Sequence, residues 1–113
     1  MCIFEDESIV YDIEPDKSLL KLFPVRGLIV TAKGSDYDFI SRCFFPITGV
    51  DEDPVTGSAH TTLTPYWSKK LGKDSLLAKQ VSSRGGVLKC VLDDDRVIIG
   101  GEAVTYLKGS ITI

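Results

Sequence analysis

One segment of this chain, residues 56–71, repeats its apolar side chains at intervals of three and four positions, and this limits the folds open to it. The interval places those side chains on one face of an α-helix, which other parts of the chain must then cover. Gly72 follows where a left-handed residue ends many helices. Pro65 lies inside the segment and removes a backbone hydrogen bond or bends the helix, so we expect its second half to be displaced from its first.

The rest of the chain consists largely of segments typical of β-strands. Runs rich in β-branched and aromatic residues alternate with glycine, proline and aspartate turns. We therefore expect strands at residues 3–11, 25–32, 37–45, 77–82, 87–92, 96–100 and 103–113, and a short helix at residues 16–22 opened by Asp16. This pattern predicts the α+β class, with a mixed or antiparallel sheet or barrel wrapped around one central helix. The length predicts a single domain, residues 1–113.

The charge balance argues against a nucleic-acid partner. Thirteen basic and sixteen acidic residues give a net charge of -3, and no basic stripe is interleaved with aromatic residues. The apolar runs are far shorter than the ~20 residues needed to cross a bilayer, and the N-terminus is acidic, so we expect neither a membrane partner nor a secretory signal. Cys2, Cys43 and Cys90 lack the close spacing of metal or redox motifs. We expect free thiols in a cytoplasmic protein, with neither a metal nor a cofactor.

The segment at residues 51–60, DEDPVTGSAH, places reactive side chains at the start of the predicted helix. Backbone N–H groups at a helix start carry partial positive charge and bind anions. Gly57 lets a ligand approach the backbone, Ser58 offers a hydroxyl, and Asp53, just outside the helix, is able to hold or transfer a proton. The same residue types commonly serve only to cap a helix, and the pattern by itself leaves both interpretations open.

Other polar residues near this segment also admit two interpretations. Arg42, on the strand that leads to it, is able to bind a substrate carboxylate or to neutralise the neighbouring acidic residues, and a structural ion pair is the default expectation. His60, the one histidine, lies in the first helical turn, where the helix dipole opposes a positive charge. We expect a neutral ring that supports the site by packing. Residues 84–86 and 93–95 are expected to form exposed turns.

Three motifs together resemble the second domain of the phenazine-biosynthesis (PhzF-like) isomerase family. They are SRCFFP at residues 41–46, EDPVTGSAH followed by PYW within residues 52–67, and QVSSRGG at residues 80–86. The resemblance implies a fold similar to half of diaminopimelate epimerase, in which strands wrap a central helix. It also implies that Asp53 is a catalytic acid/base and that Gly57 and Ser58 bind substrate. Thr56 and Arg42 are further candidates for substrate binding.

The same resemblance implies an active site with two sides, of which this chain is expected to carry one. In the family, a cofactor-free proton shift isomerises a dihydro-hydroxyanthranilate with the help of a glutamate from a first domain, and we expect that domain to be absent. We therefore predict proton transfer on a small acidic metabolite, by a homodimer or together with a separately encoded N-terminal half. The alternative is a non-catalytic binding or interaction module, or a truncated remnant.

Overall fold

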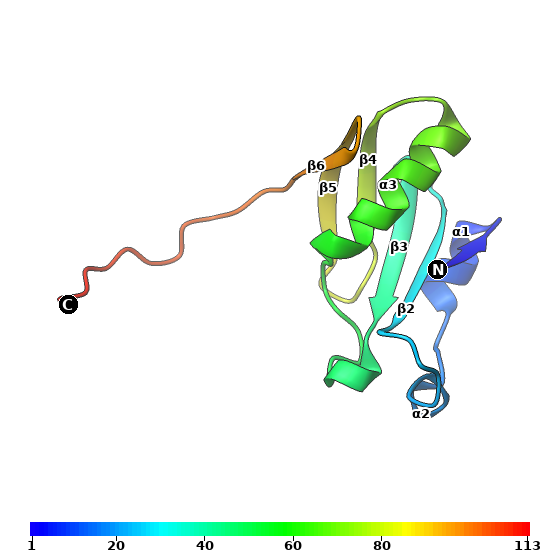
Figure 1. Ribbon diagram of the computed structural model, residues 1–113, viewed down its shortest axis with the longest axis horizontal. Helices are drawn as coiled ribbons and strands as arrows, with labels where there is room; N and C mark the ends of the chain where they lie inside the picture. The colour runs from blue at the N-terminus through cyan, green and yellow to red at the C-terminus, as the bar shows by residue number, and fades with distance from the viewer.

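A computed structural model describes residues 1–113, which form one sheet with helices packed on it (Figure 1). The strands are β1 (Cys2–Phe4), β2 (Leu28–Lys33), β3 (Phe39–Phe44), β4 (Ser75–Gln80), β5 (Gly86–Asp93) and β6 (Arg96–Gly100). The helices are α1 (Glu7–Asp12), α2 (Lys17–Leu20), the short 3-10 helix η1 (Pro46–Thr48) and α3 (Gly57–Leu71). None of these helices has both the length and the apolar character needed to cross a membrane.

The six strands form one mixed sheet, in the order in which they occur along the chain. β1 pairs with β2, and β3 with β4, in parallel, whereas the pairs β2–β3, β4–β5 and β5–β6 are antiparallel. Because β1 and β6 each pair with one neighbour only, the sheet is open. The α+β class and the mixed sheet around a helix are confirmed, as an open sheet and not as a closed barrel.

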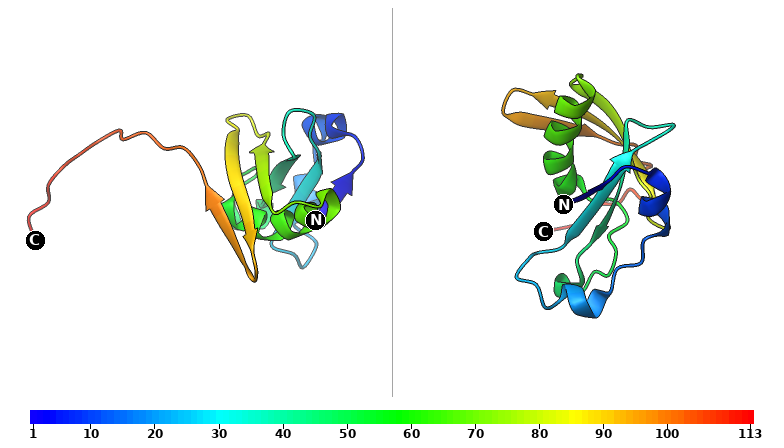
Figure 2. Two further views of the ribbon diagram at one scale, coloured as in Figure 1. Left: turned by 90° about the horizontal axis from the view of Figure 1, so that it is seen from above. Right: turned by 90° about the vertical axis from the view of Figure 1, so that its right-hand side faces the viewer.

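Helix α3 crosses one face of the sheet and carries the larger core (Figures 1 and 2). Leu63 and Trp67 are buried there, and the Trp67 ring stacks on Phe39 at a centroid distance of 5.8 Å and an interplanar angle of 6°. Trp67 Nε1 also donates a 3.0 Å hydrogen bond to the buried Thr31 hydroxyl. The apolar period of residues 56–71 thus identified the helix that covers this face.

Pro65 leaves α3 in one piece, from Gly57 to Leu71, with Gly72 following at a φ of 69°. The helix therefore continues through Pro65 without a break. Leu63 and Trp67, which stand on either side of Pro65 in the sequence, are buried in the same core. Burial of these side chains stabilises the helix on one sheet face and offsets the hydrogen bond lost at proline.

Helix α1 lies on the opposite face of the sheet from α3, as the side view in Figure 2 shows, and covers a smaller core. Val10 of α1 is completely buried against apolar side chains of β2 and β3. Successive side chains of a strand point to opposite faces, so β3 is buried along its whole length between the two cores. This confirms the two apolar faces predicted for residues 37–45.

Several local predictions are also confirmed. The Asp16 carboxylate accepts the Leu19 N–H at 2.9 Å and begins α2. Asp94 has a φ of 50° at the tip of the β5–β6 hairpin, and Gly85 has a φ of 69° in the turn before β5. All three cysteines are free thiols. The cap and the two turns depend on neighbouring residues, which is why a local pattern predicts them.

Two segments predicted as strands have other structures. Residues 3–11 contain only the short β1 before α1 begins, because the Asp6 carboxylate accepts the Ser8 N–H at 2.8 Å and caps that helix. Residues 103–113 have no regular structure and lead away from the sheet (Figure 1). Tyr106 is 99% exposed and Ile111 is 89% exposed. A β-prone sequence forms a strand only beside a partner strand, and this tail has none in the chain.

Deletion of residues 104–113 is expected to leave the free energy of unfolding within about 0.5 kcal/mol of its original value, because these side chains are exposed. Leu63→Ala is expected to lower it by about 2–5 kcal/mol, because truncation of a completely buried side chain leaves a cavity. Urea unfolding followed by Trp67 fluorescence measures both changes. A loss of more than about 1 kcal/mol on deletion would contradict the solvated tail.

Candidate active site

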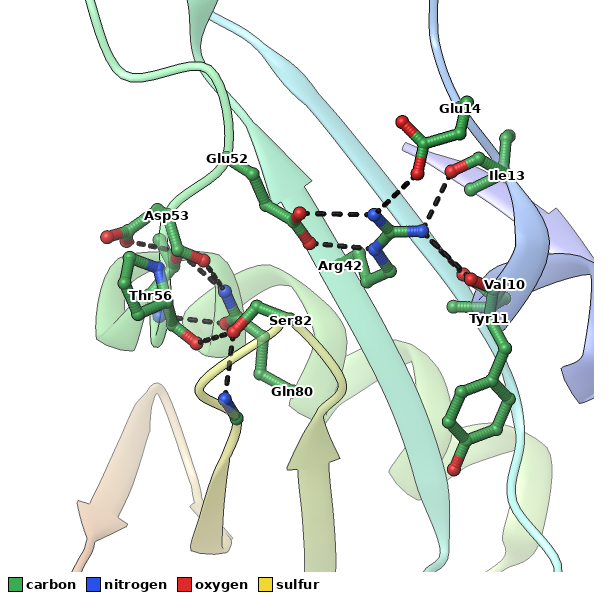
Figure 3. A network of polar contacts seen from close by, with 12 residues as sticks. Val10, Tyr11, Ile13, Glu14, Arg42, Glu52, Asp53, Thr56, Gln80 and Ser82 are labelled. Atoms are coloured by element: carbon green, nitrogen blue, oxygen red, sulfur yellow. Dashed lines mark hydrogen bonds and ion pairs between the residues drawn. The ribbon is translucent and has the colours of Figure 1, made fainter.

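The loop between β3 and α3 carries the motif of residues 51–60 and lies beside the end of β4 (Figure 3). The Asp53 N–H donates to the Cys43 carbonyl at 2.9 Å, which fixes the loop to the sheet. Thr56 is the N-cap of α3, yet no side chain caps the helix. Asp53 and Ser58 therefore do not satisfy the first amides of α3, which is the role that simple capping would give them.

Every polar group of Thr56 has a partner within the chain (Figure 3). Its N–H donates to Gln80 Oε1 at 2.8 Å, and its carbonyl accepts a bond of 2.8 Å from His60 Nδ1. Its hydroxyl donates to Asp53 Oδ2 and accepts a 3.2 Å bond from Gln80 Nε2. The sequence makes Thr56 a candidate for substrate binding, whereas in the fold its polar groups hold Asp53, Gln80 and His60 together.

The turn before β5 supports the same loop. The Ser82 hydroxyl donates to the Pro54 carbonyl at 2.7 Å and accepts the Gly85 N–H at 3.0 Å. A methyl group on Gly86 would collide with the Val55 side chain, so glycine allows β5 to begin directly against the loop. Sequence reasoning assigned this turn only to the surface. The contact between Ser82 and Pro54 spans 28 positions of the chain and leaves no local signal.

A hollow of about 290 Å³ opens between this loop, the start of α3 and the segment before β2. Its lining residues include Asp53 together with Arg26, Phe45, Val50, Gly57 and Ser58. A larger hollow, of about 590 Å³, is lined by residues 5–7 and 33–35 without any apolar side chain. Three of its lining residues are acidic, which disfavours an anionic ligand. The smaller hollow, which contains the motif, is the candidate active site.

Arg26 belongs to this hollow, and sequence reasoning missed it. Its guanidinium carbon lies 5.9 Å from the centre of the Phe45 ring, and no carboxylate pairs with it. Residues 25–32 were predicted to be a buried strand, but β2 begins only at Leu28, so Arg26 stays exposed in the preceding loop. Arg26 and the start of α3 thus both line the hollow. The positive charge that they contribute favours an anionic ligand.

Arg42 lies on the other side of the loop and is paired with residues of α1, the segment after α1 and the loop itself (Figure 3). Its guanidinium donates to Glu52 at 2.7 and 3.1 Å and to the Ile13 carbonyl at 2.7 Å, and the residue is 6% exposed. The hydrogen bonds to Glu52 raise the pKa of Arg42, while burial acts in the opposite direction. The structural ion pair expected by default is present, and it uses the donors that a substrate carboxylate would need.

His60 is completely buried in the first turn of α3, outside the lining of the hollow. Its Nδ1 donates to the Thr56 carbonyl, and its Nε2 has no partner. Burial lowers the pKa of His60 from its usual value of 6.5 and favours the neutral ring. This position suits the supporting role expected from the sequence. Burial likewise raises the pKa of the Cys43 thiol to about 12, which keeps that neighbour of the loop protonated and unreactive.

Comparison with known proteins shows what this chain is similar to. Residues 1–109 match the family described as phenazine biosynthesis-like protein. An uncharacterized isomerase of Halalkalibacterium halodurans is 51% identical over 111 residues, which cover 96% of this chain and 42% of the relative. An uncharacterized isomerase of Pseudomonas aeruginosa is 50% identical over 113 residues, which cover 100% of this chain and 43% of the relative. The similarity therefore extends over nearly the whole chain.

A solved structure shows the same similarity in three dimensions. The crystal structure of a phenazine biosynthesis protein of the PhzF family from Enterococcus faecalis superimposes with a TM-score of 0.89 at 49% sequence identity. The match covers 98% of this chain and 43% of that one. The two bacterial relatives are named as isomerases, and the fold and the motif assign this chain to the family of these proteins. The chain belongs to the phenazine biosynthesis-like (PhzF) family, and it spans 42–43% of the length of these relatives.

Gly57 offers a specific test of the hollow, because the fold does not require glycine there. A methyl group at this position would meet no other atom within 4 Å. Gly57→Ala is therefore expected to raise the free energy of unfolding by up to about 1 kcal/mol, since alanine is the better helix former. The same methyl group would protrude where a ligand approaches α3. Binding of benzoate, followed by NMR titration, is expected to weaken by about tenfold or more.

The matched control for this prediction is Thr62→Ala, on the exposed side of α3 and outside the hollow. It is expected to leave benzoate binding within about twofold of the original chain, because it changes only helix propensity. Equal benzoate affinities of the original chain and Gly57→Ala would rule out a ligand contact at Gly57.

His60 is expected to give the fold a pH dependence of definite sign. Since its pKa is lowered in the folded state, the unfolded chain binds the proton more readily. The resulting stabilisation is complete above the usual pKa of 6.5 and is lost as the pH falls from there toward the folded-state pKa. Urea unfolding at about pH 7 and 5.5 should show this loss in the free energy of unfolding. His60→Gln should remove the part of the pH dependence that comes from His60. An NMR midpoint for the ring at or above 6.5 would contradict the prediction.

Proposed function

We propose that this chain supplies one side of the active site of a cofactor-independent isomerase, in which Asp53 moves a proton on a small acidic metabolite. The observation that carries the proposal is the presence of Asp53 in the lining of one hollow, together with the uncapped start of α3. The two bacterial relatives named as isomerases, at 50% and 51% identity, support isomerisation as the reaction class.

Asp53 suits proton transfer because one of its carboxylate oxygens is fixed and the other is open. Oδ2 accepts the Thr56 hydroxyl proton, whereas no donor of the chain binds Oδ1. A carboxylate held in this way is oriented and still able to take or return a proton. While Asp53 holds the proton, the electrons of the broken C–H bond stay on the substrate, so the step consumes neither oxidant nor reductant.

The lining of the hollow supports an acidic substrate with an apolar portion. Arg26 and the first amides of α3, at Gly57 and Ser58, favour a carboxylate or a comparable anion. Phe45 and Val50 offer apolar surface beside them. The negative group would therefore bind at the helix start, with the carbon skeleton extending over the aromatic ring.

We further propose that a second polypeptide closes the hollow, either another copy of this chain or a separate chain that corresponds to the remainder of the relatives. Large apolar side chains stay exposed around η1 and after α2, next to residues that line the hollow: Leu22, Phe23, Val25, Ile47 and Val50. Exposed apolar surface of this kind favours association. In a homodimer the Asp53 side chains of both copies would share one cleft. One of them is then able to donate a proton to the substrate while the other removes one.

Deuterium uptake tests this function on many candidate substrates at once. The chain is incubated in D2O with a mixture of small carboxylic acids, and mass spectrometry detects any acid that exchanges a carbon-bound proton. Asp53→Asn is expected to slow uptake by about 10²–10⁴-fold, because its amide cannot accept the proton. Thr62→Ala serves as the control. Uptake that is unchanged in Asp53→Asn would contradict the assigned role.

The same assay separates the two ways of completing the site. If a second copy is needed, uptake per chain should rise with concentration, in parallel with the dimer fraction from sedimentation equilibrium. A constant rate on a monomer would contradict the homodimer. Benzoate binding without any uptake would instead favour a non-catalytic binding module.

A further inference from the structure

Gln80, at the end of β4, is a completely buried amide whose side-chain partners all belong to the loop that carries Asp53 (Figure 3). Its Oε1 accepts the Thr56 N–H at 2.8 Å. Its Nε2 donates to the Asp53 carbonyl at 2.5 Å and to the Thr56 hydroxyl at 3.2 Å. The amide thus uses its acceptor and both donors on two residues that lie 24 and 27 positions away in the sequence.

These bonds have a fixed direction. The Gln80 Nε2 group is only a hydrogen-bond donor, so its N–H points at a lone pair of the Thr56 hydroxyl oxygen. The single hydroxyl proton of Thr56 is thereby left for Asp53 Oδ2, which accepts it as a carboxylate oxygen. A chain of donors from Gln80 through Thr56 therefore ends on Asp53 Oδ2 and fixes the orientation of its carboxylate.

The position is buried in the sheet beside Ser41. An apolar side chain of similar length would fill the same space but would leave the Thr56 N–H and the Asp53 carbonyl without these partners. Gln80 makes none of its side-chain hydrogen bonds to the strands on either side of it. The amide is satisfied only when the loop adopts the conformation that places Asp53 at the hollow.

We propose that Gln80 is the positioning residue of this site: it orients Asp53 through Thr56 and leaves the Gly57 and Ser58 amides as the open donors of α3. The inference rests on the proposed function, because it concerns the orientation of the carboxylate that this function uses as the proton acceptor. It also explains why Thr56, the neighbour of the two exposed residues, has no group free for a ligand.

Hydrogen exchange of the Thr56 amide tests the positioning directly. Gln80→Met keeps the length of the side chain and removes its hydrogen bonds. We expect the Thr56 amide to exchange at least about tenfold faster, while amides in the middle of β2 and β3 keep their rates. Ser41→Ala is the matched control, because it removes a buried hydroxyl without a partner beside Gln80 and should leave Thr56 unchanged.

Binding and proton transfer give a second readout, which a purely structural role would not move in the same way. Gln80→Met is expected to weaken benzoate binding by about tenfold or less and to slow deuterium uptake by a larger factor, because the orientation of Asp53 affects proton transfer more than it affects anion binding. Equal losses in both measurements, or unchanged Thr56 exchange in a folded Gln80→Met, would overturn the proposal.

A second pair of variants applies if Gln80→Met fails to fold. Thr56→Val removes only the hydroxyl that links Gln80 to Asp53, and Thr56→Ser restores it. We expect slow uptake in the first variant and uptake within about threefold of the original chain in the second. Equal uptake by the two would overturn the proposal. If the original chain shows no uptake at all, the proposed isomerase function fails, while the exchange rate of the Thr56 amide still decides whether Gln80 positions the loop.

Discussion

The packing of α3 against the sheet is the contact on which the rest of the structure depends. Phe39, Leu63 and Trp67 are almost completely buried in it, and the stacked rings of Phe39 and Trp67 fix the helix relative to β3. The start of α3, and with it the positive end of the helix dipole, is thereby directed at the hollow. A site supported in this way by a packed helix and a sheet keeps its geometry without a bound ligand.

Two buried polar networks hold the loop of residues 51–56 on this frame. Arg42 binds Glu52 on the side of α1, and Gln80 binds Thr56 and Asp53 on the side of β4 (Figure 3). Buried polar groups are costly unless all their partners are present, so each network favours one conformation of the loop. The two networks bind neighbouring residues from opposite faces of the sheet, which couples the position of Asp53 to both cores.

The edges of the sheet and the hollow are both open to contact with another polypeptide. The chain spans 42–43% of the relatives it matches, and β-prone or apolar side chains stay exposed in the tail and around η1. Strands without partners and apolar surface without cover are the features that association with another polypeptide would bury. The proposed second side of the site is in keeping with this pattern.

The sequence by itself determined the features that depend on near neighbours. The apolar period of α3, the cap at Asp16 and the hairpin turn at Asp94 each follow from a few adjacent residues, and the motif around Asp53 indicated the family. Only the tertiary structure decided that residues 103–113 remain unpaired and that Arg26, Gln80 and Ser82 join the site. Gln80 and Ser82 reach partners 24 to 28 positions away, and the folded sheet, rather than any local pattern, brings such residues together.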